Sequence, residues 1–239
     1  MALTDGNTNR WMRRRTGLLA SVLCAAPLLA HPMGNFSVNH YSRLAVKAGR
    51  IRLNYVLDLA EIPTFQEMQT VGADPDRLPG GEELQRYAER RAAEWIAGLE
   101  LQCGGRAAAW QAVSARAEFA PGAGGLPTLK VFIQAEVPGG AGEVRYRDNN
   151  FPGRTGWKEI VIRGAAARLE GAESFTVDVS QGLANYPADL YTNPPQVLEA
   201  AFRVMPPALP PPPKTLSAPE PEPSLRAAPE PPPVPAGRA

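Results

Sequence analysis

The feature that most constrains the fold of this chain is a two-residue alternation of apolar and polar side chains, which recurs in short segments bounded by glycine, proline or asparagine. The apolar residues fall first at even positions and then, after residues 47–50, at odd ones: Phe36, Val38, Leu44 and Val46, followed by Ile51, Leu53, Tyr55 and Leu57. A period of two places alternate side chains on opposite faces of a strand. The pattern predicts a β-hairpin whose loop contains Gly49.

More segments of this kind follow, and each is bounded by turn-forming residues. Strands are predicted at residues 99–103, 107–119, 129–137, 143–147, 158–163 and 175–179. Residues 82–97 are rich in Glu, Arg, Ala and Leu, and their apolar members recur at helical spacing, which predicts one helix with a packing face. Residues 59–68 are expected to form an irregular or short helical turn around Pro63, and residues 196–202 a short helix. The fold class expected is mainly β, an immunoglobulin-like or related β-sandwich with one inserted α-helix at about 82–97.

The two ends of the chain differ in composition from this middle part. Residues 1–30 carry four arginines against one acid and then an uncharged stretch, Thr16 to Ala30, which is typical of a signal peptide cleaved after Ala30. An uncleaved anchor is the alternative. Residues 206–239 contain 14 of the 26 prolines and are expected to form a proline-rich disordered tail. The predicted domain is residues 31–205, long enough for one core.

Charge and hydropathy exclude several classes of function. Without residues 1–30 the chain has 21 basic and 23 acidic residues, which is not the electrostatic footprint of a nucleic-acid-binding protein. After residue 30 no apolar run approaches the roughly 18–20 residues that cross a bilayer. No nucleophile motif or phosphate-binding loop occurs, so the chain is not expected to be an enzyme. The predicted location is periplasmic or otherwise extracytoplasmic in a bacterial envelope.

Both histidines lie within ten residues, His31 and His40, and cleavage after Ala30 makes His31 the N-terminus. A free N-terminal histidine can chelate Ni, Co or Cu through its amine and ring nitrogen, and a second imidazole can add a third donor. Pro32 has no backbone N–H, so chelation by successive backbone amides is excluded. The candidate metal ligands are His31 and His40, with the carboxylates of Asp58 and Glu61 at the end of the partner strand.

Each candidate ligand also has a purely structural interpretation. His40 shares its strand face with Phe36 and Val38, which is typical of a hydrogen-bonded core histidine. His31 at the N-terminus can be an accident of cleavage. Asp58 and Glu61 suit a turn or a helix cap. The residue pattern leaves both interpretations open.

Four segments in order resemble the extracytoplasmic N-terminal region of bacterial nickel/cobalt transporters of the NicO type. They are residues 31–41 (HPMGNFSVNHY), 55–67 (YVLDLAEIPTFQE), 156–161 (GWKEIV) and 186–195 (YPADLYTNPP). In that family a polytopic membrane domain follows a linker, whereas this chain stops inside its proline-rich segment. The resemblance therefore implies a separately encoded membrane permease as partner. The family's motif accepts a basic residue in place of His40, which leaves His31 as the better metal candidate.

Two hypotheses about function follow. The first is an exported accessory or sensor domain for nickel/cobalt, or copper, transport or homeostasis, with a metal site at the N-terminal histidine. The second is a metal-free envelope protein-interaction module tethered by the proline-rich spacer, which at about 3.1 Å per residue reaches roughly 100 Å.

Overall fold

The computed structural model describes residues 32–206, except 48, 72–73, 75–76 and 166. These residues belong to the first of the two units into which the chain divides, Met1–Pro206 and Pro207–Ala239. The expected signal segment, His31 and the expected tail therefore lie outside the described residues.

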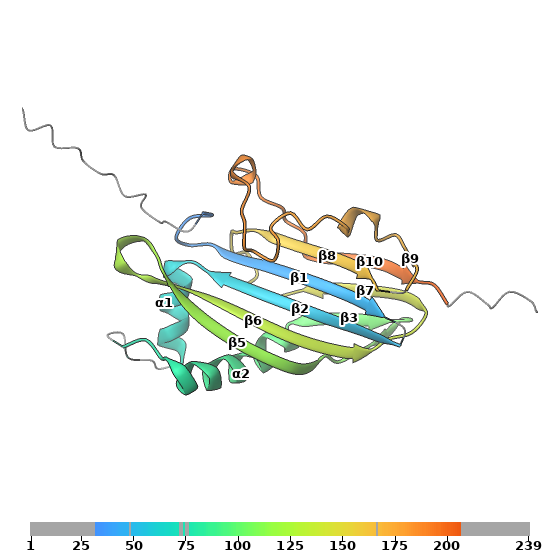
Figure 1. The fold of residues 1–239 in the computed structure, drawn as a ribbon, viewed down its shortest axis with the longest axis horizontal. Helices are drawn as coiled ribbons and strands as arrows, with labels where there is room; N and C mark the ends of the chain where they lie inside the picture. The colour runs from blue at the N-terminus through green and yellow to red at the C-terminus, as the bar shows by residue number, and fades with distance from the viewer. Residues whose placement is uncertain (1–31, 48, 72–73, 75–76, 166, 207–239) are drawn as a thin grey trace, which may run out of the picture. The chain divides into compact units, whose positions relative to one another are not determined.

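Ten strands form two five-stranded sheets that face each other (Figure 1). The first sheet has the order β5-β6-β2-β1-β8 and the second the order β4-β3-β7-β10-β9. The strands are β1 (Val38–Lys47), β2 (Arg50–Leu59), β3 (Leu99–Cys103), β4 (Arg106–Ala107), β5 (Gln111–Pro121), β6 (Pro127–Pro138), β7 (Gly142–Asp148), β8 (Lys158–Gly164), β9 (Leu169–Glu170) and β10 (Glu199–Val204). The expected β-sandwich is confirmed.

The predicted hairpin is the centre of the first sheet. β1 and β2 pair antiparallel, with Leu44 opposite Leu53, and β8 pairs parallel to β1 on the other side. The apolar residues that alternate along β1 and β2 point between the sheets, where they meet Leu101, Tyr146 and Phe202 of the second sheet in one buried cluster. The alternation that predicts the hairpin therefore also fixes which face of it is the core.

Two helices connect the hairpin to the second sheet. The predicted helix is α2 (Gly81–Ala97), which buries Tyr87, Ala88, Ala92, Trp95 and Ile96. The expected short turn around Pro63 is instead a ten-residue helix, α1 (Glu61–Thr70). Pro63 is the third residue of α1, a position whose N–H has no intrahelical partner, so the proline is tolerated there. Glu67 of α1 joins the two helices by accepting hydrogen bonds from Tyr87 and Arg91 of α2.

Two other expectations are wrong. Residues 175–179 are not a strand: the backbone N–H of Val179 donates to the Glu159 carboxylate, and Val177 is 68% exposed. Residues 196–202 are not a helix: β10 starts at Glu199, pairs with β7, and buries Ala200, Phe202 and Val204 on one face. A period of two is visible in both segments, and only the availability of a neighbouring strand decides which becomes β-structure.

Three short 3-10 helices, η1 (Ala123–Gly125), η2 (Glu173–Phe175) and η3 (Ala188–Leu190), lie in the connections. The long connection between β9 and β10 crosses the outer face of the first sheet, where Leu183, Tyr186 and Leu190 pack against Tyr41, Val56 and Trp157. We call residues 178–197 the strap. Within the described part of the chain, no helix combines the length and apolar character that crossing a membrane requires.

Candidate functional site

His40 lies on the inner face of β1, between the two sheets. Its Nδ1 donates to Asp148 Oδ2 at 2.8 Å, and both side chains are 1% exposed. Asp148 ends β7, so this hydrogen bond joins the first sheet to the second. A carboxylate can only accept, so Nδ1 is the donor in this hydrogen bond.

Tyr55 and Asn150 complete this buried group, which we call the inner cluster: His40, Tyr55, Asp148 and Asn150. The Tyr55 hydroxyl donates to Asp148 Oδ2 at 2.8 Å, and the Asn150 backbone N–H donates to Asp148 Oδ1 at 2.9 Å. The Asn150 side chain donates to the Tyr55 oxygen and to the Trp95 carbonyl. Burial, reinforced by the Asp148 charge, raises the pKa of Tyr55 well above its usual value.

The remaining nitrogen of His40 faces apolar surroundings. Nε2 is buried and has no hydrogen-bond partner, and the Phe151 ring meets the imidazole edge-on at 5.9 Å between centroids. A metal ion bound through one imidazole needs further donors close by. Across residues 32–206, with the gaps given above, no group of three His, Cys, Asp or Glu side chains is placed to hold an ion.

Asp58 lies on the opposite face of the sheet from His40. In the register of the hairpin His40 is opposite Leu57, so the next residue, Asp58, points to the outer face. There its carboxylate accepts a hydrogen bond from the Tyr186 hydroxyl at 2.6 Å and forms an ion pair with Lys130 at 3.3 Å. His40 and Asp58 therefore do not meet, and the Asp58 carboxylate holds the strap to the sheet.

Glu61 is at the start of α1 and is 1% exposed. Its Oε1 accepts the backbone N–H of Ala123 at 2.6 Å, which attaches the β5–β6 turn to the helix. Its Oε2 is buried without a partner. His31 lies outside the described residues, while the next residue, Pro32, is exposed. Of the four candidate ligands, the structure describes His40, Asp58 and Glu61, and it places these three apart from one another.

The four segments that carry the family resemblance do come together. Residues 38–41 of β1 lie between β2 and the parallel strand β8. Pro195 of the strap accepts the backbone N–H of Lys158, and Val197 donates back to the Lys158 carbonyl. Gly156 makes the approach of β8 to β1 feasible, since a Cβ there would lie 2.2 Å from the Val38 carbonyl oxygen. Segments far apart in the sequence thus form one contiguous part of the fold.

Sequence reasoning missed two residues that organise this region. Asp148 precedes an Asn-Asn-Phe-Pro-Gly turn, a position where a carboxylate usually faces solvent, yet it is 3% exposed. Glu159, on the edge strand β8, is buried on the outer face, where its carboxylate accepts hydrogen bonds from Trp157 Nε1, the Val179 and Ser180 backbone and the Ser180 hydroxyl. A weak signal existed for Asp148, because it continues the even-numbered inward face of β7 after Val144 and Tyr146.

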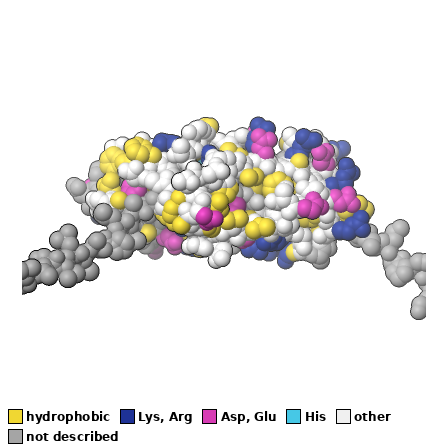
Figure 2. All heavy atoms as spheres, turned by 90° about the horizontal axis from the view of Figure 1, so that it is seen from above, with side chains coloured by type: hydrophobic (Ala, Val, Ile, Leu, Met, Phe, Trp, Pro, Cys, Tyr) yellow, Lys and Arg dark blue, Asp and Glu magenta, His cyan; other side chains and the backbone are white. Residues whose placement is uncertain are grey.

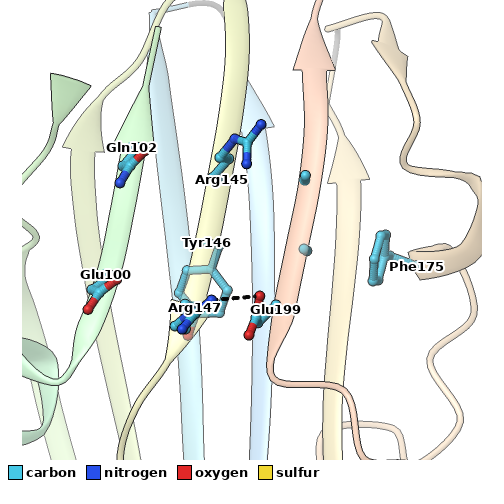
Figure 3. Close-up of a pocket in the computed structure, with 9 residues that line it drawn as sticks. Glu100, Gln102, Arg145, Tyr146, Arg147, Phe175 and Glu199 are labelled. Atoms are coloured by element: carbon cyan, nitrogen blue, oxygen red, sulfur yellow. Dashed lines mark ion pairs between the residues drawn. The ribbon is translucent and has the colours of Figure 1, made fainter. Parts of the chain in front are cut away.

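A shallow depression lies on the outer face of the second sheet (Figure 3). Arg145 and Arg147 of β7 stand between Glu100 and Gln102 of β3 on one side and Glu199 of β10 on the other. Arg147 pairs with Glu199 at 3.0 Å, and Arg145 pairs with Glu143 at 2.8 Å. Because these arginines already have carboxylate partners, the depression offers little net charge to a ligand.

Comparison with known proteins adds no family assignment. The sequence matches no protein-family model, and it matches no curated protein.

Proposed function

We propose that this chain acts outside the cytoplasm as an accessory module of nickel, cobalt or copper handling, and that it docks on a separately encoded membrane permease. It does so without binding the ion through His40, Asp58 or Glu61. The metal-handling and docking part of the proposal rests on the resemblance of residues 31–41, 55–67, 156–161 and 186–195 to the transporter region. The part about the three side chains rests on the structure, where each has a partner inside the fold and they point to different places.

Recruiting these residues to a metal would undo contacts that hold the sandwich together. Moving His40 would remove one of the three hydrogen-bond donors to the buried Asp148 carboxylate, and leaving a buried polar group short of a partner costs about 1–3 kcal/mol. Moving Asp58 would release the Tyr186 hydroxyl of the strap. The segments that resemble nickel/cobalt transporters thus form one surface of the module. In this proposal, that surface contacts the membrane permease.

Co-purification tests this function. The full chain is exported from a bacterial host together with a nickel/cobalt permease from the same genome, the membranes are solubilised, and the permease is captured. The expected result is a defined complex that persists in the presence of a chelator. A chain that stays out of the complex but binds the ion stoichiometrically by itself would contradict the docking function.

A second candidate is an amine–imidazole metal site at His31, and the observation that favours it is the position of the neighbouring residue. Pro32 is exposed, and it lacks the backbone N–H that amide chelation would need. Intact mass of the exported chain locates the N-terminus, and titration of Ni²⁺, Co²⁺ and Cu²⁺ then compares it with His31→Ala. Loss of binding in the variant is expected if this site operates, and unchanged binding would contradict it.

A further inference from the structure

The described chain begins and ends at opposite ends of the sandwich (Figure 1). Pro32 precedes β1 by a short turn, at the end where Leu59 of β2 pairs with Leu129 of β6. Val204, near the last described residue, is opposite Gly142 of β7, at the end where Arg50 of β2 pairs with Pro138 of β6. The two ends can therefore be compared as separate surfaces.

The end near Pro32 exposes large apolar side chains. Phe36 is 58% exposed, Phe65 on the outer side of α1 is 43% exposed, and Leu126 in the β5–β6 turn is 41% exposed. A single exposed apolar residue is ordinary, whereas several on one surface indicate a contact site. We call the surface formed by these three residues the apolar end.

Backbone contacts connect the three residues through the start of α1. The Ile62 N–H donates to the carbonyl of Asn35, next to Phe36, and Ile62 lies one helical turn before Phe65. The preceding residue, Glu61, binds the N–H of Ala123 in the turn that carries Leu126. A groove continues from Leu126 and is lined by apolar and glycine residues alone: Leu78, Phe119, Ala120, Pro121, Gly122, Gly125, Leu126 and Pro127.

The opposite end is charged. Arg50 and Arg52 pair with Glu136 there, and Arg168 pairs with Glu170 on the strand beside Arg203. Figure 2 shows the same contrast on one face, where Lys, Arg, Asp and Glu side chains gather toward the end at which the described chain stops. Among the described residues, the exposed Phe36, Phe65 and Leu126 thus lie at the end where the chain enters the fold, away from the ion pairs of the opposite end.

We propose that the apolar end rests on a lipid bilayer, with Phe36, Phe65 and Leu126 inserted among the lipid chains. The sequence upstream identifies this occupant. The uncharged stretch Thr16 to Ala30, preceded by three consecutive arginines, ends two residues before Pro32. A segment of that kind enters a membrane during export and, where it is retained, holds the apolar end within a few residues of the bilayer at high effective concentration.

The charged groups around the apolar end indicate which lipid headgroups are needed for binding to the bilayer. Arg77 is paired with Glu83, Arg154 donates to Gln66, and Asp189 lies in the neighbouring strap. Both signs are present, so anionic headgroups gain little attraction. Binding therefore depends on apolar insertion and needs only zwitterionic lipid.

An environment-sensitive probe tests this contact directly. Cysteine is introduced at position 65 or at position 113 in the exported full chain, with Cys24 and Cys103 replaced by serine, and is labelled with a nitrobenzoxadiazole dye. Val113 is the matched control, because it is 59% exposed and lies on β5, opposite the end of β6 that holds Glu136. Phosphatidylcholine vesicles should shift the emission of the probe at 65 to the blue and leave the probe at 113 unchanged.

Several results would overturn the proposal. The emission of the probe at position 65 would not shift, or it would shift as much as that of the probe at 113. The shift at 65 would require a permease in the vesicles, or the probe at 65 would already be blue-shifted before vesicles are added. The last result would mean that residues 16–30 of the chain itself cover the apolar end.

A second pair of variants measures affinity. Phe36→Asp/Phe65→Asp should lower vesicle binding of the processed chain about tenfold or more, while Val113→Asp leaves it unchanged, since two apolar insertions are lost only in the first. Equal thermal unfolding midpoints would show that the variants fold. This inference does not depend on permease capture. If the chain binds lipid but captures no permease, the bilayer contact stands and only the proposed docking function is overturned.

Discussion

The two faces of the first sheet both bury charged side chains, but they use them for different purposes. On the inner face, Asp148 binds His40 and Tyr55 and so joins β7 to β1 and β2. On the outer face, Glu159 binds Trp157, Val179 and Ser180 and so attaches an irregular segment to a single sheet. Loss of the inner group should loosen the whole sandwich, whereas loss of the outer one should release only the strap.

Breaking the inner cluster should have the largest effect. Asp148→Ala leaves the Tyr55 hydroxyl and the His40 Nδ1–H buried without their acceptor, so the free energy of unfolding should fall by about 3–5 kcal/mol. Urea denaturation measures the loss, and the exposed Asp189→Ala serves as control, with an expected change within about 0.5 kcal/mol. A loss below about 1 kcal/mol in Asp148→Ala would mean that this cluster does not hold the sheets together.

Alkaline pH should break the same cluster without mutation. Burial raises the pKa of Tyr55 and of Tyr146 well above the usual value, so the folded state holds both phenolic protons more tightly than the unfolded state does. Stability from these groups is complete below about pH 10 and falls above it by about 1.4 kcal/mol per tyrosine for each pH unit. The pKa values of Tyr41, Tyr87 and Tyr186 are raised by burial as well, so these residues add to the loss. Urea denaturation at pH 8, 10 and 11 should therefore show a loss of at least about 3 kcal/mol by pH 11, and Tyr55→Phe should lose about 1.4 kcal/mol less than the parent chain. A flat profile would be inconsistent with these shifts.

Releasing the strap should cost less and stay local. In Glu159→Gln one carboxylate oxygen becomes an NH₂ group facing the donors of Trp157, Val179 or Ser180, so stability should fall by about 2 kcal/mol. Hydrogen exchange should quicken in residues 178–190 and stay slow in β2 and β6. The exposed Glu170→Gln is the control. Equal acceleration across both sheets would remove the distinction between the two faces.

The smallest expected effect comes from a glycine behind the inner cluster. A Cβ at Gly98 would lie 2.3 Å from Asn150 Oδ1, so Gly98→Ala must displace the side chain that donates to Tyr55 and to the Trp95 carbonyl. We expect a loss of about 1 kcal/mol in thermal or urea unfolding. Gly140→Ala, where the added Cβ meets nothing within 4 Å, should be neutral. Equal effects of the two variants would argue against a packed Asn150.

The sequence predicts most of the fold because its strands alternate and its long helix is amphipathic. The hairpin, helix α2 and strands β3, β6, β7 and β8 follow from local periodicity alone. The errors lie where long-range contacts decide. β10 becomes a strand because β7 is there to pair with it, and residues 175–179 are diverted by the buried carboxylate of Glu159, 16 or more positions earlier in the chain.

The candidate site was harder to predict for the same reason. That His40 is an inward-facing residue is visible in the alternation, but its partner Asp148 lies 108 residues away. Asp58 follows Leu57, the residue opposite His40 in the hairpin, and the alternation between faces separates the two side chains. Glu61 lies beyond the hairpin, at the start of α1. Their roles as attachment points for the strap and for the β5–β6 turn depend on Tyr186 and Ala123, which no local pattern identifies.

Titration of Ni²⁺ and Co²⁺ into the exported full chain and into Asp58→Asn/Glu61→Gln tests the central claim that these carboxylates serve the fold and not an ion. The two isotherms should superimpose, because both side chains already have partners inside the domain. An affinity at least tenfold weaker in the variant, with its thermal unfolding midpoint unchanged, would contradict the account and return these carboxylates to a metal site.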